Sequence, residues 1–173
     1  MRWLIDGYNV IRRDPDLRAR EAESLEAGRT ALVDLVAGTA RESRDDFTVV
    51  FDGARVSGGS PAGGRVQVLF SRPPRTADDE LMRLARQHGP GAIVVTSDRK
   101  IQDAARRAGC PVLTAEQFLQ GLTAESVQGD LADPATKDED EEEDPPREKR
   151  GNPRKLSKEA RAAQRALRRL RPS

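Results

Sequence analysis

Aspartates follow three separate apolar runs of this sequence, in a pattern that suggests a site for a divalent cation. Asp6, Asp52 and Asp98 each come at or just after the end of such a run. Several carboxylates in one place repel one another unless a positive charge lies between them. Hard cations such as Mg²⁺ or Mn²⁺ prefer carboxylate and water oxygens and need neither His nor Cys. These aspartates therefore predict a Mg²⁺ or Mn²⁺ site if the fold brings them together.

Further polar side chains stand close to these aspartates along the chain. An acidic pair at 78–79 opens an expected helix, and an asparagine follows Asp6 by three residues. Ser97 is expected to cap the helix that follows it, and Asp103 lies about one helical turn past Asp98. The candidate catalytic residues are Asp6, Asp52, Asp78 and Asp98, and the candidate supporting residues are Asn9, Asp79, Ser97 and Asp103.

Short apolar runs and helical patterns alternate over the first 125 residues. The predicted strands cover 2–5, 47–51, 66–70, 92–95 and 111–113, and the predicted helices cover 24–44, 76–89, 101–108 and 115–122. This alternation is typical of βαβ units and predicts a three-layer α/β/α fold with a mostly parallel sheet. Because ligands bind at the carboxyl ends of parallel strands, the aspartates should meet at one edge.

A second interpretation of these acidic residues remains open. Asp and Ser at a strand-to-helix junction are also the usual N-caps of helices. Any one of Asp6, Asp52 or Asp98 taken alone fits a cap or a loop brace as well as it fits a metal ligand. The metal interpretation depends on their convergence.

Charge is strongly segregated along the 173 residues, although the net charge is only +1. Residues 126–146 carry nine acids and one lysine, whereas residues 147–173 carry eleven basic residues and two acids. We therefore predict a folded α/β domain at 1–125, a disordered acidic linker at 126–155 and a basic amphipathic helical tail at 156–173. The tail could bind RNA, and the run Asp138–Asp144 could instead fold back on it and screen it.

The composition excludes several classes of site. A single cysteine, Cys110, leaves no disulfide framework and no thiolate metal site. A single histidine, His88, rules out a histidine pair that activates a ribose 2′-hydroxyl. If the chain cleaves RNA, water is then the expected nucleophile at phosphorus, and the RNA products should carry 5′-phosphate and 3′-hydroxyl ends. No apolar run is long enough to span a membrane, and the N-terminus does not resemble a signal peptide, so we expect a cytoplasmic protein.

Four segments together resemble the YacP-like branch of the NYN-domain nucleases, within the PIN-like superfamily. They are Ile5-Asp6-Gly7-Tyr8-Asn9-Val10, Val50-Phe51-Asp52-Gly53, Thr76-Ala77-Asp78-Asp79 and Val95-Thr96-Ser97-Asp98. The resemblance covers about residues 1–122 and implies a PIN-like, Rossmann-like fold and metal-dependent ribonuclease activity, in some members on ribosome-associated messenger RNA. It also implies that Asp6, Asp78 and Asp98 are the core metal ligands, which Asn9 and Asp52 support.

The candidates for RNA contact are Tyr8, Arg55, Arg72 and Arg75. The arginines flank a glycine-rich stretch and a proline-containing turn, where they could form a phosphate-contacting rim or merely a solvated surface. Tyr8 could stack on a base or pack against the loop after the first strand.

The sequence is compatible with three alternative functions. The first is an endoribonuclease that hydrolyses RNA with a metal-activated water, with RNA and the ribosome as partners. The second is a catalytically weak RNA- or ribosome-binding adaptor with the same fold. The third is a phosphohydrolase on a similar sheet, which the lack of a paired Asp-x-Asp at Asp6 disfavours. A full set of acids favours the first, because a pure binder gains nothing from negative charge beside RNA phosphates.

Overall fold

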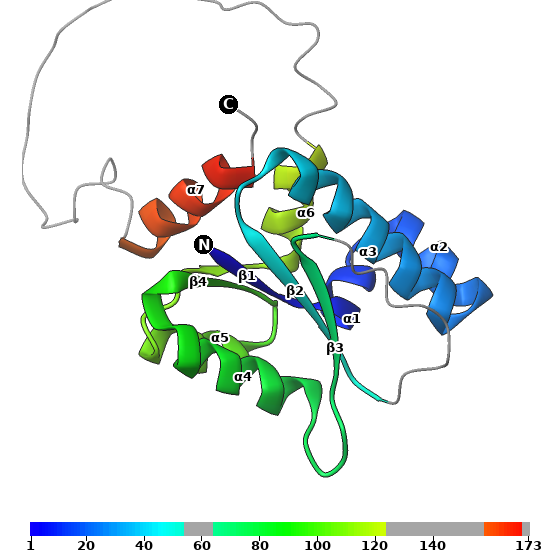
Figure 1. Ribbon diagram of the computed structural model, residues 1–173, viewed down its shortest axis with the longest axis horizontal. Coiled ribbons are helices and arrows are strands. Elements are labelled where there is room, and N and C mark those ends of the chain that lie inside the picture. Colours follow the sequence, from blue (N-terminus) through cyan, green and yellow to red (C-terminus); the bar gives the residue numbers. More distant parts are fainter. Residues whose placement is uncertain (54–63, 124–157, 171–173) are drawn as a thin grey trace, which may run out of the picture.

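The computed structural model of the chain describes residues 1–53, 64–123 and 158–170. Within these ranges a five-stranded sheet has the order β3-β2-β1-β4-β5, and all its neighbouring strands are parallel (Figure 1). The strands are β1 (Arg2–Asp6), β2 (Asp46–Phe51), β3 (Val66–Phe70), β4 (Ala92–Val95) and β5 (Val112–Leu113). The predicted α/β fold is confirmed. Arg55 and the predicted linker at 126–155 lie outside the described residues.

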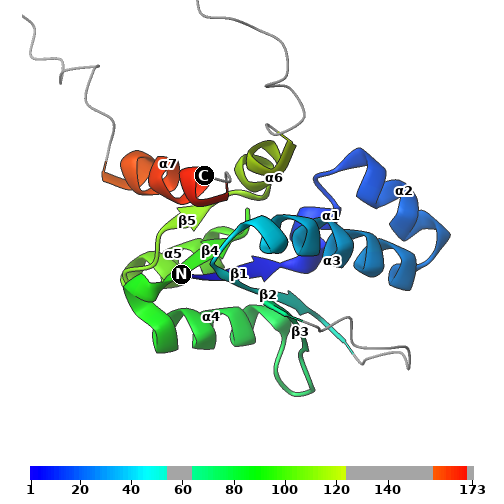
Figure 2. The same cartoon turned by 45° about the horizontal axis from the view of Figure 1, so that its top comes forward.

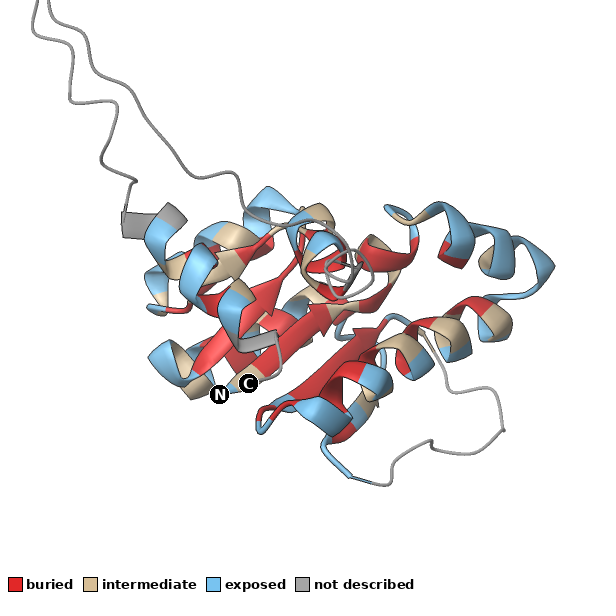
Figure 3. Ribbon diagram, turned by 90° about the horizontal axis from the view of Figure 1, so that it is seen from above, coloured by how far each residue is buried: buried red, intermediate tan, exposed pale blue. Residues whose placement is uncertain are grey.

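Helices cover both faces of this sheet, which gives the three predicted layers (Figure 2). One face carries α4 (Ala77–His88) and α5 (Arg99–Arg107), and the other carries α1 (Gly7–Ile11), α3 (Leu25–Glu42) and α6 (Ala115–Thr123). Alternate residues of β1 point to opposite faces of the sheet: Trp3 and Ile5 pack on one face and Leu4 on the other. Because both faces are covered, β4 is buried along its whole length and β1 and β2 are buried except at their ends, as Figure 3 shows, whereas the edge strand β3 is only partly buried.

The chain reverses its direction of travel across the sheet beside β1. From β1 it proceeds outward through β2 to β3, and then crosses back to β4 and β5 on the other side of β1. The connections on the two sides of β1 run over opposite faces, because α1 and α3 lie on one face and α4 on the other. This switch point lies between β1 and β4, and parallel sheets bind ligands outside the carboxyl ends of the strands at such a point.

Two helices between β1 and β2 are absent from the sequence prediction. Helix α1 begins directly after β1, and α2 (Pro15–Glu23) follows with Asp14 as its N-cap. Helix α2 buries only Leu17, so it has almost no apolar periodicity for a sequence pattern to detect. Helix α3 then begins at the Ser24 cap, close to its predicted start.

The basic C-terminal segment forms α7 (Lys158–Leu170), which packs against α6 and β5 (Figures 1 and 2). Ala163 and Ala166 are 8% and 3% exposed and belong to the same apolar core as Trp3. The apolar stripe of this helix is therefore used within the domain, and its exposed side carries Arg161, Arg165 and Arg168. None of the described helices is long and apolar enough to cross a membrane.

Candidate active site at the carboxyl edge of the sheet

Four aspartates reach the carboxyl edge of the sheet from four different elements. Asp6 ends β1, and Asp98 follows β4, the strand beside it at the switch point. Asp52 follows β2 on the other side of β1, and Asp78 lies in the first turn of α4. We call these four side chains the acidic edge.

Asp6 is half-buried and its carboxylate is held from two directions. Asp6 Oδ1 accepts a hydrogen bond from the backbone N–H of Asn9 at 3.2 Å and thereby caps α1. Asp6 Oδ2 accepts a hydrogen bond from Thr96 Oγ1 at 2.9 Å. The cap and the metal interpretations are therefore compatible, because each carboxylate oxygen keeps a second lone pair.

Thr96 connects Asp6, at the end of β1, with Asp98, which follows β4. It is fully buried, and its hydroxyl both donates to Asp6 and accepts from the backbone N–H of Asp98 at 3.1 Å. Asp98 Oδ1 in turn caps α5 by accepting from the N–H groups of Lys100 and Ile101 at 2.8 and 3.2 Å. The expectation that Ser97 caps this helix is wrong, because Asp98 occupies the N-cap position.

Ser97 instead links three segments of the fold. Its backbone N–H donates to Asn9 Oδ1 at 2.8 Å, and its hydroxyl donates to Glu116 Oε2 at 3.0 Å. Glu116 also forms an ion pair with Arg13 at 3.0 Å. This chain ties α1 and α6 to the loop that carries Asp98. The sequence analysis did not predict Glu116 as part of this site, because no sequence motif links it to Asn9 or Ser97.

Burial and neighbouring carboxylates raise the pKa values of two residues of the acidic edge, Asp6 and Asp78. Burial is the main cause that raises the pKa of Asp6, and the charges of Asp78 and Asp98 raise it further, although hydrogen bonds from Thr96 and Asn9 oppose them. The pKa of Asp78 is also raised, first by burial and then by Asp98. Asp52 adds to this effect on Asp78, while Lys100 opposes it. The acids therefore share one electrostatic environment in which negative charge is in excess.

The donor set suits a hard divalent cation, because the acidic edge offers only oxygen ligands. Within residues 1–53, 64–123 and 158–170, however, no three Asp, Glu, His or Cys side chains come close enough together to hold one ion. The acids interact through space without converging on a single point. Mg²⁺ commonly takes one or two direct carboxylates and completes its shell with water and substrate oxygens, so the arrangement remains compatible with that ion.

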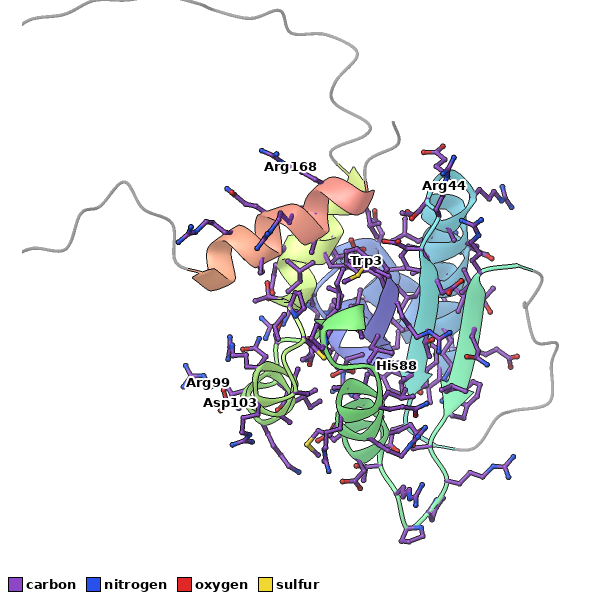
Figure 4. The ribbon with its side chains drawn as sticks, turned by 60° about the vertical axis from the view of Figure 1, so that its left-hand side comes forward. Trp3, Arg44, His88, Arg99, Asp103 and Arg168 are labelled. Atoms are coloured by element: carbon purple, nitrogen blue, oxygen red, sulfur yellow. The ribbon has the colours of Figure 1, made fainter. Side chains whose placement is uncertain are left out.

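Two of the expected supporting acids point elsewhere. Asp79 belongs to a capping box, in which its Oδ2 accepts from the backbone N–H of Thr76 at 3.1 Å. Asp103 lies on the outer side of α5 (Figure 4) and pairs with Arg106 at 3.1 Å. Five residues past the N-cap, Asp103 is rotated by about 140° around the helix from Asp98. The structure does not bring these two side chains into the acidic edge.

Asp52 has a partner that sequence reasoning missed. The Ser71 hydroxyl, which is buried, donates a short hydrogen bond to Asp52 Oδ1 and accepts a longer one from the N–H of Gly53. Ser71 comes directly after β3, next to the end of β2. It thus fixes Asp52, although Asp52 itself is exposed.

The described RNA-contact candidates differ in their surroundings. Arg72 and Arg75 are exposed in the loop that leads to Asp78. Tyr8 is half-buried and packs edge-on against Phe51, with ring centroids 5.3 Å apart. Tyr8 Oη accepts hydrogen bonds from Nε and Nη2 of Arg29 on α3. Tyr8 was expected to stack on a base or to pack against the loop after the first strand; α1 begins directly after β1, and Tyr8 instead packs against Phe51 at the end of β2 and Arg29 of α3.

Comparisons with known proteins agree with this fold. A family model described as the YacP-like NYN domain matches residues 3–169, which extends past residue 122 and includes α7. A curated Bacillus subtilis (strain 168) protein, YacP, described as uncharacterized, is 34% identical over 122 residues, covering 68% of this chain and 72% of that protein.

Two solved structures are also similar. The crystal structure of Rae1 (YacP) from Bacillus subtilis has a TM-score of 0.62 and 30% identity over 73% of this chain and 75% of that chain. The crystal structure of a mutant of the same Rae1 protein has a TM-score of 0.61 and 28% identity over 73% of this chain and 76% of that chain.

Proposed function

This chain belongs to the YacP-like NYN domain family, whose domain is of the nuclease type, and we propose that it is a divalent-metal-dependent endoribonuclease. The observation that carries the proposal is the acidic edge at the switch point of the sheet. Burial and neighbouring carboxylates raise the pKa values of both Asp6 and Asp78. Perturbed pKa values of this kind cluster at functional sites.

In this proposal Asp6, Asp78 and Asp98 bind the ion, Mg²⁺ or Mn²⁺, with at most two of them, Asp6 included, as direct ligands and the rest through water. Asp52 supports them. A bound ion of this kind supplies activation of a water and neutralisation of the charge that grows on phosphorus. Thr96 orients Asp6 and the loop that carries Asp98, because its hydroxyl bonds to both. Asn9 and Ser97 hold that loop against α1 through their 2.8 Å hydrogen bond.

Hydrolysis by water should leave 5′-phosphate and 3′-hydroxyl ends. The chain has one histidine, His88, which lies at the end of α4 with Nε2 at 3.3 Å from Arg2 Nη1. Arg2 begins β1, so His88 belongs to the amino edge of the sheet, opposite the acidic edge (Figure 4). A histidine-assisted attack by the ribose 2′-hydroxyl therefore has no residues to perform it.

RNA is the proposed substrate, and two arginine-bearing surfaces support it. Arg72 and Arg75 stand in the exposed loop before Asp78, where they can contact phosphates beside the cleaved bond. The exposed side of α7 carries Arg161, Arg165 and Arg168. We propose that this arginine face of α7 contacts a longer RNA, including RNA in a ribosome, by charge attraction to its backbone.

The decisive experiment assays the Asp6→Asn variant for RNA cleavage. Wild-type protein should cleave single-stranded RNA with Mg²⁺ or Mn²⁺, and should be inactive in EDTA and on a small phosphomonoester. The variant should lose activity by roughly 100-fold or more, because it loses a proposed direct ligand. Asp103→Asn is the matched control and should keep full activity, since Asp103 pairs with Arg106 on the outer side of α5.

Two results would overturn the proposal. Cleavage that Asp6→Asn leaves intact would remove the acidic edge from the chemistry. RNA binding without any metal-dependent cleavage by the wild-type protein would identify an adaptor instead of an enzyme.

A further inference from the structure

Arg29 lies in an aromatic cage at the carboxyl edge of the sheet. It stands near the start of α3, and its guanidinium carbon is 5.4 Å from the ring centroid of Tyr8, 5.7 Å from that of Phe51 and 5.2 Å from that of Phe70. Phe51 and Phe70 are the last residues of β2 and β3, and Tyr8 is the second residue of α1, which begins directly after β1. Arg29 therefore lies at the edge that also carries the acidic residues.

The hydrogen bonds of Arg29 leave much of its guanidinium available. Nε and Nη2 each donate to Tyr8 Oη. A guanidinium has five N–H donors, so three of them have no hydrogen-bond acceptor among the described residues. No acidic side chain in the described ranges forms an ion pair with Arg29, whereas Arg83 and Arg106 each pair with a neighbouring acid.

A second arginine lies over the same tyrosine. The guanidinium carbon of Arg12 is 5.8 Å from the Tyr8 centroid, and Arg12 is exposed. Tyr8 stands two residues after Asp6, so the ring that both cations contact belongs to the segment that also carries an acid of the acidic edge. Aromatic rings stabilise a cation but do not neutralise it. Positive charge is thus held in place beside a site where negative charge is in excess.

We propose that Arg29 and Arg12 form a subsite for a phosphodiester group of single-stranded RNA, adjacent to the phosphate that is cleaved. Tyr8 is the support that holds both cations, which explains why its ring is packed and not free to stack on a base. An RNA strand that approaches four aspartates needs cations beside them to offset repulsion, and the planar fork of arginine suits phosphate oxygens. This inference rests on the proposed ribonuclease function and names part of its substrate site.

The test measures binding of a short single-stranded RNA to the full chain in Ca²⁺ over a range of salt concentrations. Arg29→Met should weaken binding by about tenfold to a hundredfold, the value of a charge-assisted hydrogen bond. The slope of log affinity against log salt should fall by about 0.7, the value for one single-strand phosphate contact. Arg12→Met should reduce the slope similarly.

Two comparison variants separate binding from structure. Arg41→Met makes the same change on the exposed far end of α3 and should leave both affinity and slope unchanged. Arg29→Lys keeps the charge without the fork, so it should retain the salt slope but lose affinity. If Arg29→Met does not fold, Arg29→Lys and Arg12→Met still test the subsite.

Different results would refute the ribonuclease function and the arginine subsite. Wild-type protein that does not bind single-stranded RNA would refute the proposed function. Wild-type binding with an unchanged salt slope in both Arg29→Met and Arg12→Met would refute the subsite alone and assign Arg29 to packing between α3 and the sheet.

Discussion

Asp78 is a partly buried acid of the acidic edge whose charge is opposed by Asp98 and only partly compensated by Lys100. Its pKa is raised by burial and then by the charge of Asp98, whereas Asp6 and Asp98 both accept hydrogen bonds from backbone N–H groups. An acid with a raised pKa in the folded state destabilises the fold when it is ionised, and this penalty disappears as the pH falls through that pKa. The folded protein therefore carries an electrostatic cost at neutral pH.

We predict that Asp78→Asn raises the melting temperature of the metal-free protein at pH 7, and that the gain shrinks as the pH is lowered. Thermal unfolding in EDTA at several pH values measures both effects. Adding Mn²⁺ should stabilise the wild-type protein more than the variant, because binding to the native state adds stability. Asp34→Asn, an exposed site on α3, serves as the control. A variant that melts below the wild type in EDTA would contradict this prediction.

At the scale of elements, the Asp-Gly-Tyr-Asn segment depends on a close approach between α1 and β2. A Cβ atom built on Gly7 would lie 2.3 Å from Cε1 of Phe51. The Phe51 ring is fully buried at the end of β2 and stacks on Phe70 at 5.8 Å, so it has little room to move. Glycine at this position thus allows α1 to start directly after Asp6.

Gly7→Ala should therefore lower the free energy of unfolding by about 1–3 kcal/mol, the usual cost of overpacking. Gly38→Ala is the matched control, because its Cβ would meet nothing within 4 Å in the middle of α3. This control should gain roughly 0.5–1 kcal/mol from helix propensity. Urea denaturation of the three proteins provides the comparison, and equal effects of the two substitutions would show that Phe51 yields.

At the scale of the whole molecule, the acidic edge and the arginine face of α7 are separate surfaces. Helix α7 lies near the N-terminus of the chain, toward the amino ends of the strands (Figures 1 and 2), whereas the acidic edge lies at the carboxyl ends. Only an RNA that extends along the molecule can contact both. Chain length should therefore separate the contributions of the two surfaces.

Reversing charge at Arg165 and Arg168 together, to Glu, should raise the KM for a long RNA by about tenfold or more. The same double variant should cleave a short oligonucleotide at the wild-type rate. Reversing Arg41 and Arg44 at the far end of α3 changes net charge equally and controls for it. If the double variant changes the cleavage of long and short substrates to the same extent, α7 does not contribute to RNA recognition.

Local sequence patterns by themselves determined the class of fold and the list of acids. Apolar runs predict four strands of the described sheet, because a strand buried on both faces requires such a run, and the alternation of Val66, Val68 and Phe70 predicts the partly buried edge strand β3. The aspartates after those runs could be assigned to one edge because parallel strands share their direction. Their roles as metal ligands remain predictions.

Tertiary structure decided which of these side chains meet. Asp79 and Asp103 turn away into local pairs, Asp98 displaces Ser97 as the cap, and α7 uses its apolar stripe within the domain. Arg29 reaches Tyr8 across 21 positions of sequence, and Thr96 reaches Asp6 across 90. The spacing of apolar residues indicates whether a segment is a helix or a strand and which of its faces is buried. The partner of a polar side chain depends instead on how segments far apart in the sequence pack together.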